Sequence, residues 1–159
     1  MTQRWSNLLF AHWPVDAGRL RALVPSPLSL DMFDGTAWIS LTPFFLSHLR
    51  LRGFPPVPLV SAFPELNVRT YVTVGDKPGV YFFSLDAGSV LAVAGARTFY
   101  RLPYYRARML VQKVGESFHY VSHRTHGGAP TADFVATYRP TGDAARSTPG
   151  SLDHFLTER

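Results

Sequence analysis

The sequence predicts a single domain over residues 1–159 in the α+β class, with two or three short helices around a mostly antiparallel β-sheet or β-barrel. Three observations lead to this prediction. Thirteen prolines and twelve glycines divide the chain into short segments, and these residue types mark turns. At least seven of the segments read as strands, and several of them alternate apolar and polar residues as strands with one buried face do. The hydrophobic fraction of 46% is enough for one core in a chain of 159 residues.

The N-terminal third is expected to hold two strands and one helix. Residues 5–13 are apolar on both faces, which is typical of a central strand. Asp16 suits the N-cap of a short helix that Pro25 must end. Alternation over 36–45 predicts the second strand, and the proline-rich segment 52–58 predicts a long loop.

The clearest strand pattern lies in the middle of the chain. Residues 65–74 alternate most clearly, 75–79 form a hairpin-type connection, and 80–87 are the partner strand. Residues 90–100 fit either a helix or a strand. Their alanines favour a helix, which Pro103 must end.

Three more strands and a last helix are expected toward the C-terminus. The strands cover 104–113, 118–124 and 134–139. A loop of small and polar residues follows at 141–150, and Ser151 caps the final helix.

Composition excludes several classes of protein. No apolar run reaches the roughly 18 residues that a membrane helix needs, so no membrane partner is expected. The N-terminus lacks the pattern of a signal peptide, which predicts a cytoplasmic protein. The net charge of +5 comes from sixteen Lys and Arg against eleven Asp and Glu. The arginines are spread along the chain without a run of three, so we expect no nucleic-acid partner.

No metal or cofactor is expected. There is no cysteine and no phosphate-binding glycine motif. His119 and His123 would lie about 13 Å apart on one strand, too far to share an ion. The two lysines, Lys77 and Lys113, lie in a turn and at a strand end, where neither is a convincing Schiff-base nucleophile.

The polar face of the 65–74 segment is the first candidate site. Glu65, Asn67 and Arg69 would point to the same side of the strand. In an open sheet this face is simply wet, whereas in a barrel it lines an enclosed cavity. Same-face neighbours lie about 6.6 Å apart, so Glu65 and Arg69 need a ligand or a third group between them.

The second candidate is residues 97–108, which contain four Arg and three Tyr. Arg97, Tyr100, Tyr104 and Arg106 are the candidate ligand-binding residues, because guanidinium groups suit carboxylates and phosphates and tyrosine adds a hydroxyl. The alternative is a solvated strand face with ordinary aromatic packing.

Several blocks of the sequence resemble the YqjF-like family, a bacterial family of uncharacterised proteins also called domain-of-unknown-function family 2071. The blocks cover nearly the whole chain: Leu8–Val15, Leu23–Leu28, Phe33–Trp38, Ser61–Tyr71, Gly79–Asp86 and Leu102–Arg106. The most specific part reads Phe-Pro-Glu-Leu-Asn-Val-Arg-Thr-Tyr. The resemblance implies a fold more than a function.

That family is in turn similar to the acetoacetate decarboxylases, which fold as an antiparallel β-cone around a cavity. Ala96-Arg97 and the following Leu102-Pro103 resemble the stretch that leads to the decarboxylases' Phe-Pro-Lys-Lys motif. There the first lysine forms the Schiff base and the second lowers its pKa. The resemblance places Tyr104 and Tyr105 at these positions, and tyrosine cannot form an imine. It also places Glu65 where the decarboxylases keep an acid that faces the cavity.

The sequence thus leads to one expectation with an open alternative. The expectation is a polar-lined cavity for a small organic acid, without Schiff-base decarboxylase activity. Arg97 or Arg106 would hold the carboxylate, and Glu65 would be the catalytic acid or base if a reaction occurs. The alternative is a non-catalytic binding or oligomerisation module. The resemblance further implies a chain that ends early, after 155–159, so that either the barrel lacks its last strands or a partner chain in a homo-oligomer supplies them.

Overall fold

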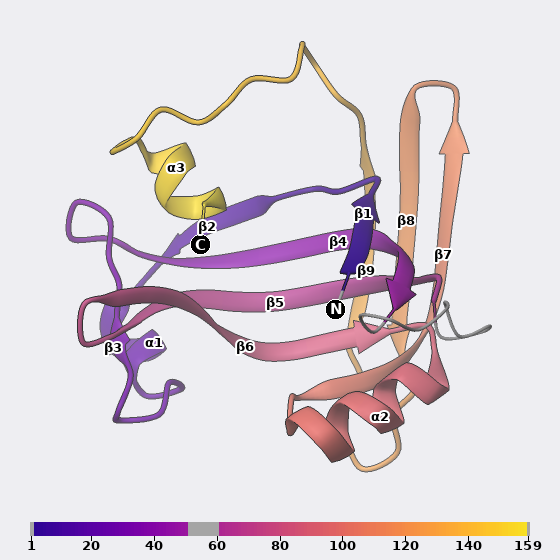
Figure 1. Cartoon of the computed structure of the whole chain (residues 1–159), viewed down its shortest axis with the longest axis horizontal. Helices are drawn as coiled ribbons and strands as arrows, with labels where there is room; N and C mark the ends of the chain where they lie inside the picture. Colours follow the sequence, from indigo (N-terminus) through magenta and orange to yellow (C-terminus); the bar gives the residue numbers. More distant parts are fainter. Residues whose placement is uncertain (1, 51–60, 159) are drawn as a thin grey trace.

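The computed structural model describes residues 2–50 and 61–158, and it confirms an α+β fold dominated by antiparallel strands. Within these residues one curled sheet has the strand order β1-β4-β5-β6-β7-β8-β9, with β2 also paired to β4 and β3 to β5 (Figure 1). The strands are β1 (Thr2–Ser6), β2 (Ala11–Val15), β3 (Ser29–Leu30), β4 (Ala37–Arg50), β5 (Phe63–Val74), β6 (Lys77–Ala87), β7 (Tyr104–Val114), β8 (Ser117–Arg124) and β9 (Asp133–Tyr138). The helices are α1 (Ala17–Arg21), α2 (Val90–Tyr100) and α3 (Leu152–Thr157).

The single central strand expected over 5–13 is wrong. The chain forms two short strands here, and both pair with the edge of β4 that β5 leaves free. Asn7, between them, has a positive φ of 53°. Asparagine tolerates this left-handed conformation better than most residues, and it interrupts the extended chain. The apolar side chains of the 5–13 segment instead stack at the edge of the sheet; Trp5, for example, lies on Phe44 with ring centroids 4.4 Å apart.

The helix caps behave as the sequence predicts. The Asp16 carboxylate accepts a hydrogen bond from the Arg19 backbone N–H at 2.8 Å, and Ser151 caps α3 in the same way. Helix α1 ends at Arg21, a few residues before Pro25. The ambiguous 90–100 segment is helical, and the left-handed Arg101 ends it.

The β5–β6 hairpin is tighter than expected. Lys77 already pairs with Val74, so the turn consists of Gly75 and Asp76 alone. Gly75 has a φ of 58°, which glycine adopts without strain. The loop expected at 52–58 lies outside the described residues, and 141–150 contain neither helix nor strand, as expected.

A change of direction at β7 gives the molecule its second layer. Helix α2 connects β6 to β7, which pair in parallel over only three residues, 104–106 on β7. Strand β7 then pairs with β8, and β8 with β9, in an antiparallel three-stranded layer. This layer stands across the ends of β4, β5 and β6 (Figure 1). The phenol of Tyr120 on β8 donates to the Glu65 carbonyl at 2.8 Å and ties the layers together. No helix in the described part of the chain is long and apolar enough to cross a membrane.

We expect Tyr120→Phe to lower the free energy of unfolding by about 1–2 kcal/mol, because it removes a buried hydrogen bond and leaves a strand carbonyl with one partner fewer. Urea denaturation measures the change. Tyr100→Phe is the matched control, because Tyr100 is 62% exposed on α2. Equal stability of the two variants would show that the bond to Glu65 does not hold the layers together.

Candidate functional site

The polar face of β5 is turned into the protein. Glu65, Asn67 and Arg69 are 3%, 3% and 7% exposed. Strand β5 lies between β4 and β6, so this face is bordered by strands on both sides. The residues opposite it on β4 are also buried: Phe44, Thr42 and Ser40. The three predicted site residues on β5 therefore share the interior and not a wet outer surface.

Glu65 lies in a mainly apolar part of this interior. Its register partners are Phe44 on β4 and Ala87 on β6, both fully buried. Burial raises the pKa of the Glu65 carboxyl to about 7, and hydrogen bonds from the side chains of Tyr104 and Asn67 oppose this rise. A carboxyl that titrates near neutral pH can both donate and accept a proton.

Tyr104 is the predicted residue that the structure brings to Glu65. It lies at the start of β7, next to Leu85 of β6, and its hydroxyl is 3.2 Å from each oxygen of the Glu65 carboxylate. Burial and the neighbouring Glu65 raise the pKa of Tyr104 far above the usual range of a phenol. Tyr104 is therefore a neutral hydrogen-bond donor to the carboxylate.

Arg69 is a buried cation without an anionic partner in the described part of the chain. The ion pairs there are Arg124 with Asp86 and His123 with Asp133. The Arg69 Nε has no hydrogen-bond partner among the described residues. Its guanidinium lies over the rings of Phe10 and Tyr71, at 5.3 and 6.0 Å from their centroids. Such cation–π contacts offset only part of the cost of burying a charge.

Glu65 cannot compensate Arg69 directly. The two residues are four positions apart on one strand, which places their backbones about 13 Å from each other. Asn67 lies between them, and its Oδ1 is buried without a hydrogen-bond partner among the described residues. The interior face thus holds an acid at one end, a cation at the other and an unsatisfied acceptor in the middle.

His12 and Tyr71 belong to the Arg69 end, although the sequence did not identify them as site residues. The Tyr71 hydroxyl donates to the Leu156 carbonyl of α3 at 2.8 Å and lies 3.3 Å from the His12 Nδ1. Burial and then the charge of Arg69 lower the pKa of His12, which favours the neutral ring. His12 pairs with Ser40, which pairs with Arg69. The proximity of His12 to Arg69 follows from the pairing of β2, β4 and β5, which the sequence alone does not give.

Three other predicted residues are not part of this interior. Arg97 and Tyr100 are exposed on the last turns of α2, and the Arg97 Nη1 donates to the Tyr104 carbonyl at 2.8 Å. Arg106 pairs with Ala87, the last residue of β6. The Arg106 side chain is exposed, and its Nη2 donates to the Thr125 carbonyl at 3.3 Å. The structure therefore separates these residues from the Glu65–Arg69 face, which the sequence had grouped with them.

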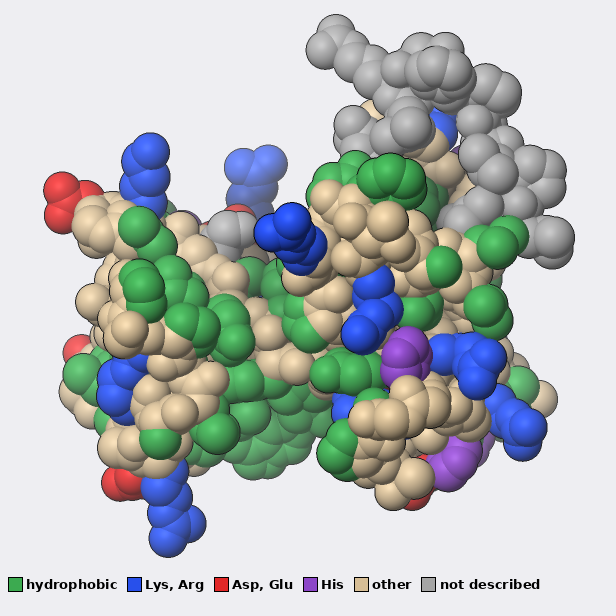
Figure 2. Space-filling view, turned by 90° about the horizontal axis from the view of Figure 1, so that it is seen from below, with side chains coloured by type: hydrophobic (Ala, Val, Ile, Leu, Met, Phe, Trp, Pro, Cys, Tyr) green, Lys and Arg blue, Asp and Glu red, His purple; other side chains and the backbone are tan. Residues whose placement is uncertain are grey.

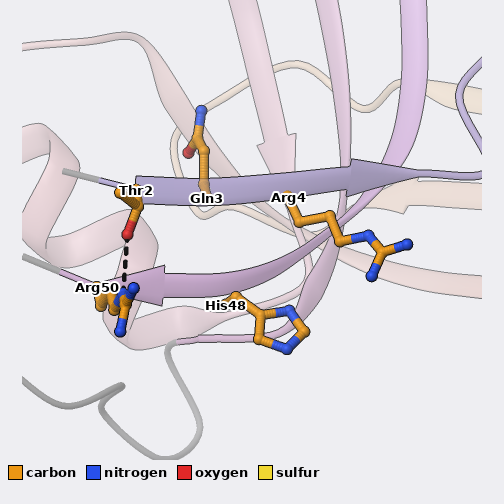
Figure 3. Close-up of a pocket in the computed structure, with 5 residues that line it drawn as sticks. All are labelled: Thr2, Gln3, Arg4, His48 and Arg50. Atoms are coloured by element: carbon orange, nitrogen blue, oxygen red, sulfur yellow. Dashed lines mark hydrogen bonds between the residues drawn. The ribbon is translucent and has the colours of Figure 1, made fainter.

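A surface hollow of about 250 Å³ lies elsewhere, between β1 and the end of β4. It is lined by Thr2, Gln3, Arg4, His48 and Arg50, and the Arg50 Nε donates to the Thr2 hydroxyl at 3.0 Å (Figure 3). All five side chains are exposed, and none belongs to the predicted site. In residues 2–50 and 61–158, no three His, Asp or Glu side chains are grouped closely enough to hold a metal ion.

Comparison with known proteins confirms the family that the sequence blocks indicate. The model of the family DUF2071, described as an uncharacterized conserved protein, matches residues 2–159. The uncharacterized protein YqjF of Bacillus subtilis (strain 168) is 55% identical over 159 residues. The alignment covers the whole of this chain and 65% of YqjF, so the chain spans a little under two thirds of that relative.

Solved structures confirm the acetoacetate decarboxylase-like fold. Acetoacetate decarboxylase from Legionella pneumophila aligns with a TM-score of 0.60 at 15% identity, over 85% of this chain and 48% of its own. The enduracididine biosynthesis enzyme MppR, solved in complex with pyruvate, aligns with a TM-score of 0.55 at 13% identity, over 76% of this chain and 50% of its own. Identities this low show a shared fold alone.

Glu65 should make the protein less stable as the pH rises. Between its ordinary pKa of 4.5 and its folded pKa of about 7, only the unfolded chain gives up the proton. The free energy of unfolding therefore falls through this window and stays low above it. The difference in pKa corresponds to about 3 kcal/mol. Urea denaturation at pH 4, 5.5 and 8 measures the free energy of unfolding. In Glu65→Gln this free energy should no longer fall between pH 4 and pH 8.

The exposed Glu116 provides the matched control, because Glu116→Gln removes a carboxyl from the β7–β8 turn. Its profile should follow that of the wild type. Parallel profiles for Glu65→Gln and the wild type would contradict the raised pKa.

Tyr104→Phe should raise the pKa of Glu65 above 7, because the phenol hydrogen bond favours the ionised carboxylate. Carbon-13 NMR titration can follow this group, since the chain has only three glutamates. Tyr105→Phe removes the neighbouring phenol and should leave the pKa of Glu65 in place. A fall in the pKa of Glu65 in Tyr104→Phe would overturn the assignment of Tyr104 as the donor.

Proposed function

The chain belongs to the DUF2071 family of uncharacterised conserved proteins, and we propose that it binds a small carboxylic acid on the inward face of β5. Arg69 pairs with the ligand carboxylate, the Asn67 Oδ1 accepts a hydrogen bond from the hydroxyl when the ligand is a hydroxy acid, and Glu65 exchanges a proton with the ligand. Tyr104 orients the Glu65 carboxyl.

The observation that carries this proposal is the buried, uncompensated guanidinium of Arg69. It is 7% exposed, and no ion pair in the described part of the chain includes it. An isolated buried charge costs several kcal/mol, so such groups are normally paired. A carboxylate fits because the planar guanidinium can donate two parallel hydrogen bonds to its two oxygens.

The rest of the face selects a ligand with a second polar group. Glu65, Asn67 and Arg69 lie along one buried face, so a ligand whose carboxylate pairs with Arg69 directs its remaining groups toward Asn67 and Glu65. A small keto or hydroxy acid has this form, with a carboxylate at one end and an oxygen near the reactive carbon. The MppR structure, which shares the fold, was solved with pyruvate, a small keto acid.

The chemistry does not pass through a Schiff base. Both lysines of the chain are exposed, Lys77 at the β5–β6 turn and Lys113 near the end of β7. On the family resemblance, Tyr104 and Tyr105 replace the two motif lysines of the decarboxylases, and a phenol forms no imine. What remains is proton transfer. The Glu65 carboxylate removes a proton from the carbon next to a ketone, and the resulting carboxyl returns one to the same carbon.

A non-catalytic binding or oligomerisation module is the second candidate. The Tyr104 hydroxyl lies 3.2 Å from both Glu65 oxygens, so the acid already has an internal partner. This contact favours a carboxyl that is structural and takes no part in a reaction.

We expect the wild type to bind pyruvate or 2-oxobutyrate and Arg69→Gln to bind them at least tenfold more weakly, since a charge-assisted hydrogen bond contributes about 1.5–3 kcal/mol. Isothermal titration calorimetry measures the affinity, with uncharged pyruvamide as the ligand control. Arg19→Gln, which removes the same charge from the exposed face of α1, should bind like the wild type.

Arg69→Met distinguishes binding from folding. It should raise the melting temperature of the ligand-free protein, because a buried unpaired charge is replaced by an apolar side chain, and it should abolish binding. Retained affinity in both Arg69 variants would refute the proposed role.

The catalytic part has a separate test. In deuterium oxide, NMR should show faster exchange of the 2-oxobutyrate methylene protons with wild type than with Glu65→Gln, at equal binding. Binding without any enzyme-dependent exchange would establish the non-catalytic alternative.

A further inference from the structure

We propose that the outer surface around Tyr105 is a second binding site, separate from the β5 face, which takes the phosphate group of a small phosphomonoester. Its donors are Arg97 of α2, Arg106 of β7 and His126 of the β8–β9 connection. The structure brings these groups together from three separate parts of the chain.

The ring of Tyr105 is the centre of this site. The guanidinium carbon of Arg124 lies 4.3 Å from the ring centroid, and that of Arg97 lies 5.6 Å away. The His126 ring meets Tyr105 edge-on, with centroids 5.5 Å apart. A rigid aromatic ring therefore fixes three cationic or hydrogen-bonding side chains in one place.

The charges at this surface are not balanced by the described residues. Arg124 is neutralised by Asp86, with hydrogen bonds of 2.8 and 3.1 Å to its two oxygens. Arg97 and Arg106 bond to carbonyls, those of Tyr104 and Thr125, at 2.8 and 3.3 Å. A carbonyl holds a guanidinium in position without cancelling its charge. Two positive charges therefore remain.

His126 adds a neutral donor. Its Nδ1 accepts the Arg106 backbone N–H at 3.2 Å, so the single proton of the neutral ring lies on Nε2. Desolvation, and then the charges of Arg97, Arg106 and Arg124, lower the pKa of His126 and favour this neutral form.

The surplus of two charges identifies the ligand class. A phosphomonoester carries close to two negative charges at neutral pH and offers three acceptor oxygens, whereas a carboxylate carries one charge and offers two oxygens. Figure 2 views the molecule from below, the side on which α2 lies in Figure 1, and shows Lys or Arg side chains and histidines exposed there. The site is open, so the ester group can extend into solvent.

The test is a titration with phenyl phosphate at constant ionic strength, followed by the NMR signals of the Tyr105 and His126 rings. We expect saturable shifts, at least threefold weaker binding in Arg97→Ala and in Arg106→Ala, and no saturation in the double variant, because exposed charged contacts each contribute modestly. Arg19→Ala is the charge-matched control and should bind like the wild type.

Two further ligands show whether the phosphate group or the aromatic ring of phenyl phosphate is responsible for binding. Inorganic phosphate should bind with similar affinity, since the phosphate group carries the recognition. Benzoate, which has the same ring and one charge, should bind at least tenfold more weakly. Equal affinity for benzoate and phenyl phosphate, or unchanged binding in the double variant, would overturn the proposal. Arg69→Gln should not alter phenyl phosphate binding, so the result does not depend on the β5 face.

Discussion

The burial of a polar strand face is the constraint on which the rest of this structure depends. Strand β5 carries a carboxyl, an amide and a guanidinium into the interior, where each must be satisfied by the fold or by a ligand. The β7–β9 layer closes this face at the Glu65 end, where Tyr104 of β7 and Tyr120 of β8 bond to Glu65. At the other end, Phe10 and Tyr71 pack against the Arg69 guanidinium. The Tyr120–Glu65 backbone contact fixes the cover in place.

The two charged groups on this face respond differently to the same loss of water. A carboxyl can avoid the cost of burial by keeping its proton, and the pKa of Glu65 rises to about 7 for this reason. Arginine has no such option, because it stays protonated in proteins at all ordinary pH values. Arg69 therefore keeps its charge, and aromatic rings are its principal neighbours. This asymmetry makes Arg69 the stronger indication of an anionic ligand.

Much of the fold could be predicted because local patterns determine it. Alternation over 65–74 predicted β5, the glycine turn predicted its hairpin with β6, and Asp16 and Ser151 marked two helix starts. The interpretation of 5–13 failed because an edge strand that stacks aromatics looks as apolar as a central one. Alternation showed that Glu65, Asn67 and Arg69 share a face, but not which face is buried. That depends on residues distant in the sequence, such as Tyr120 at the Glu65 end and Phe10 at the Arg69 end.

The sequence spacing of Arg97 and Arg106 could not show where their side chains lie. Helix α2 and the turn into β7 direct both side chains outward, whereas the neighbouring Tyr104 side chain points to the interior. Tyr104 shows how close the two environments are. Its hydroxyl holds Glu65 inside, while its carbonyl accepts the Arg97 guanidinium outside. An anion at the outer surface that draws on Arg97 must share it with this carbonyl, and the backbone of Tyr104 thus connects the surface charge to the interior acid.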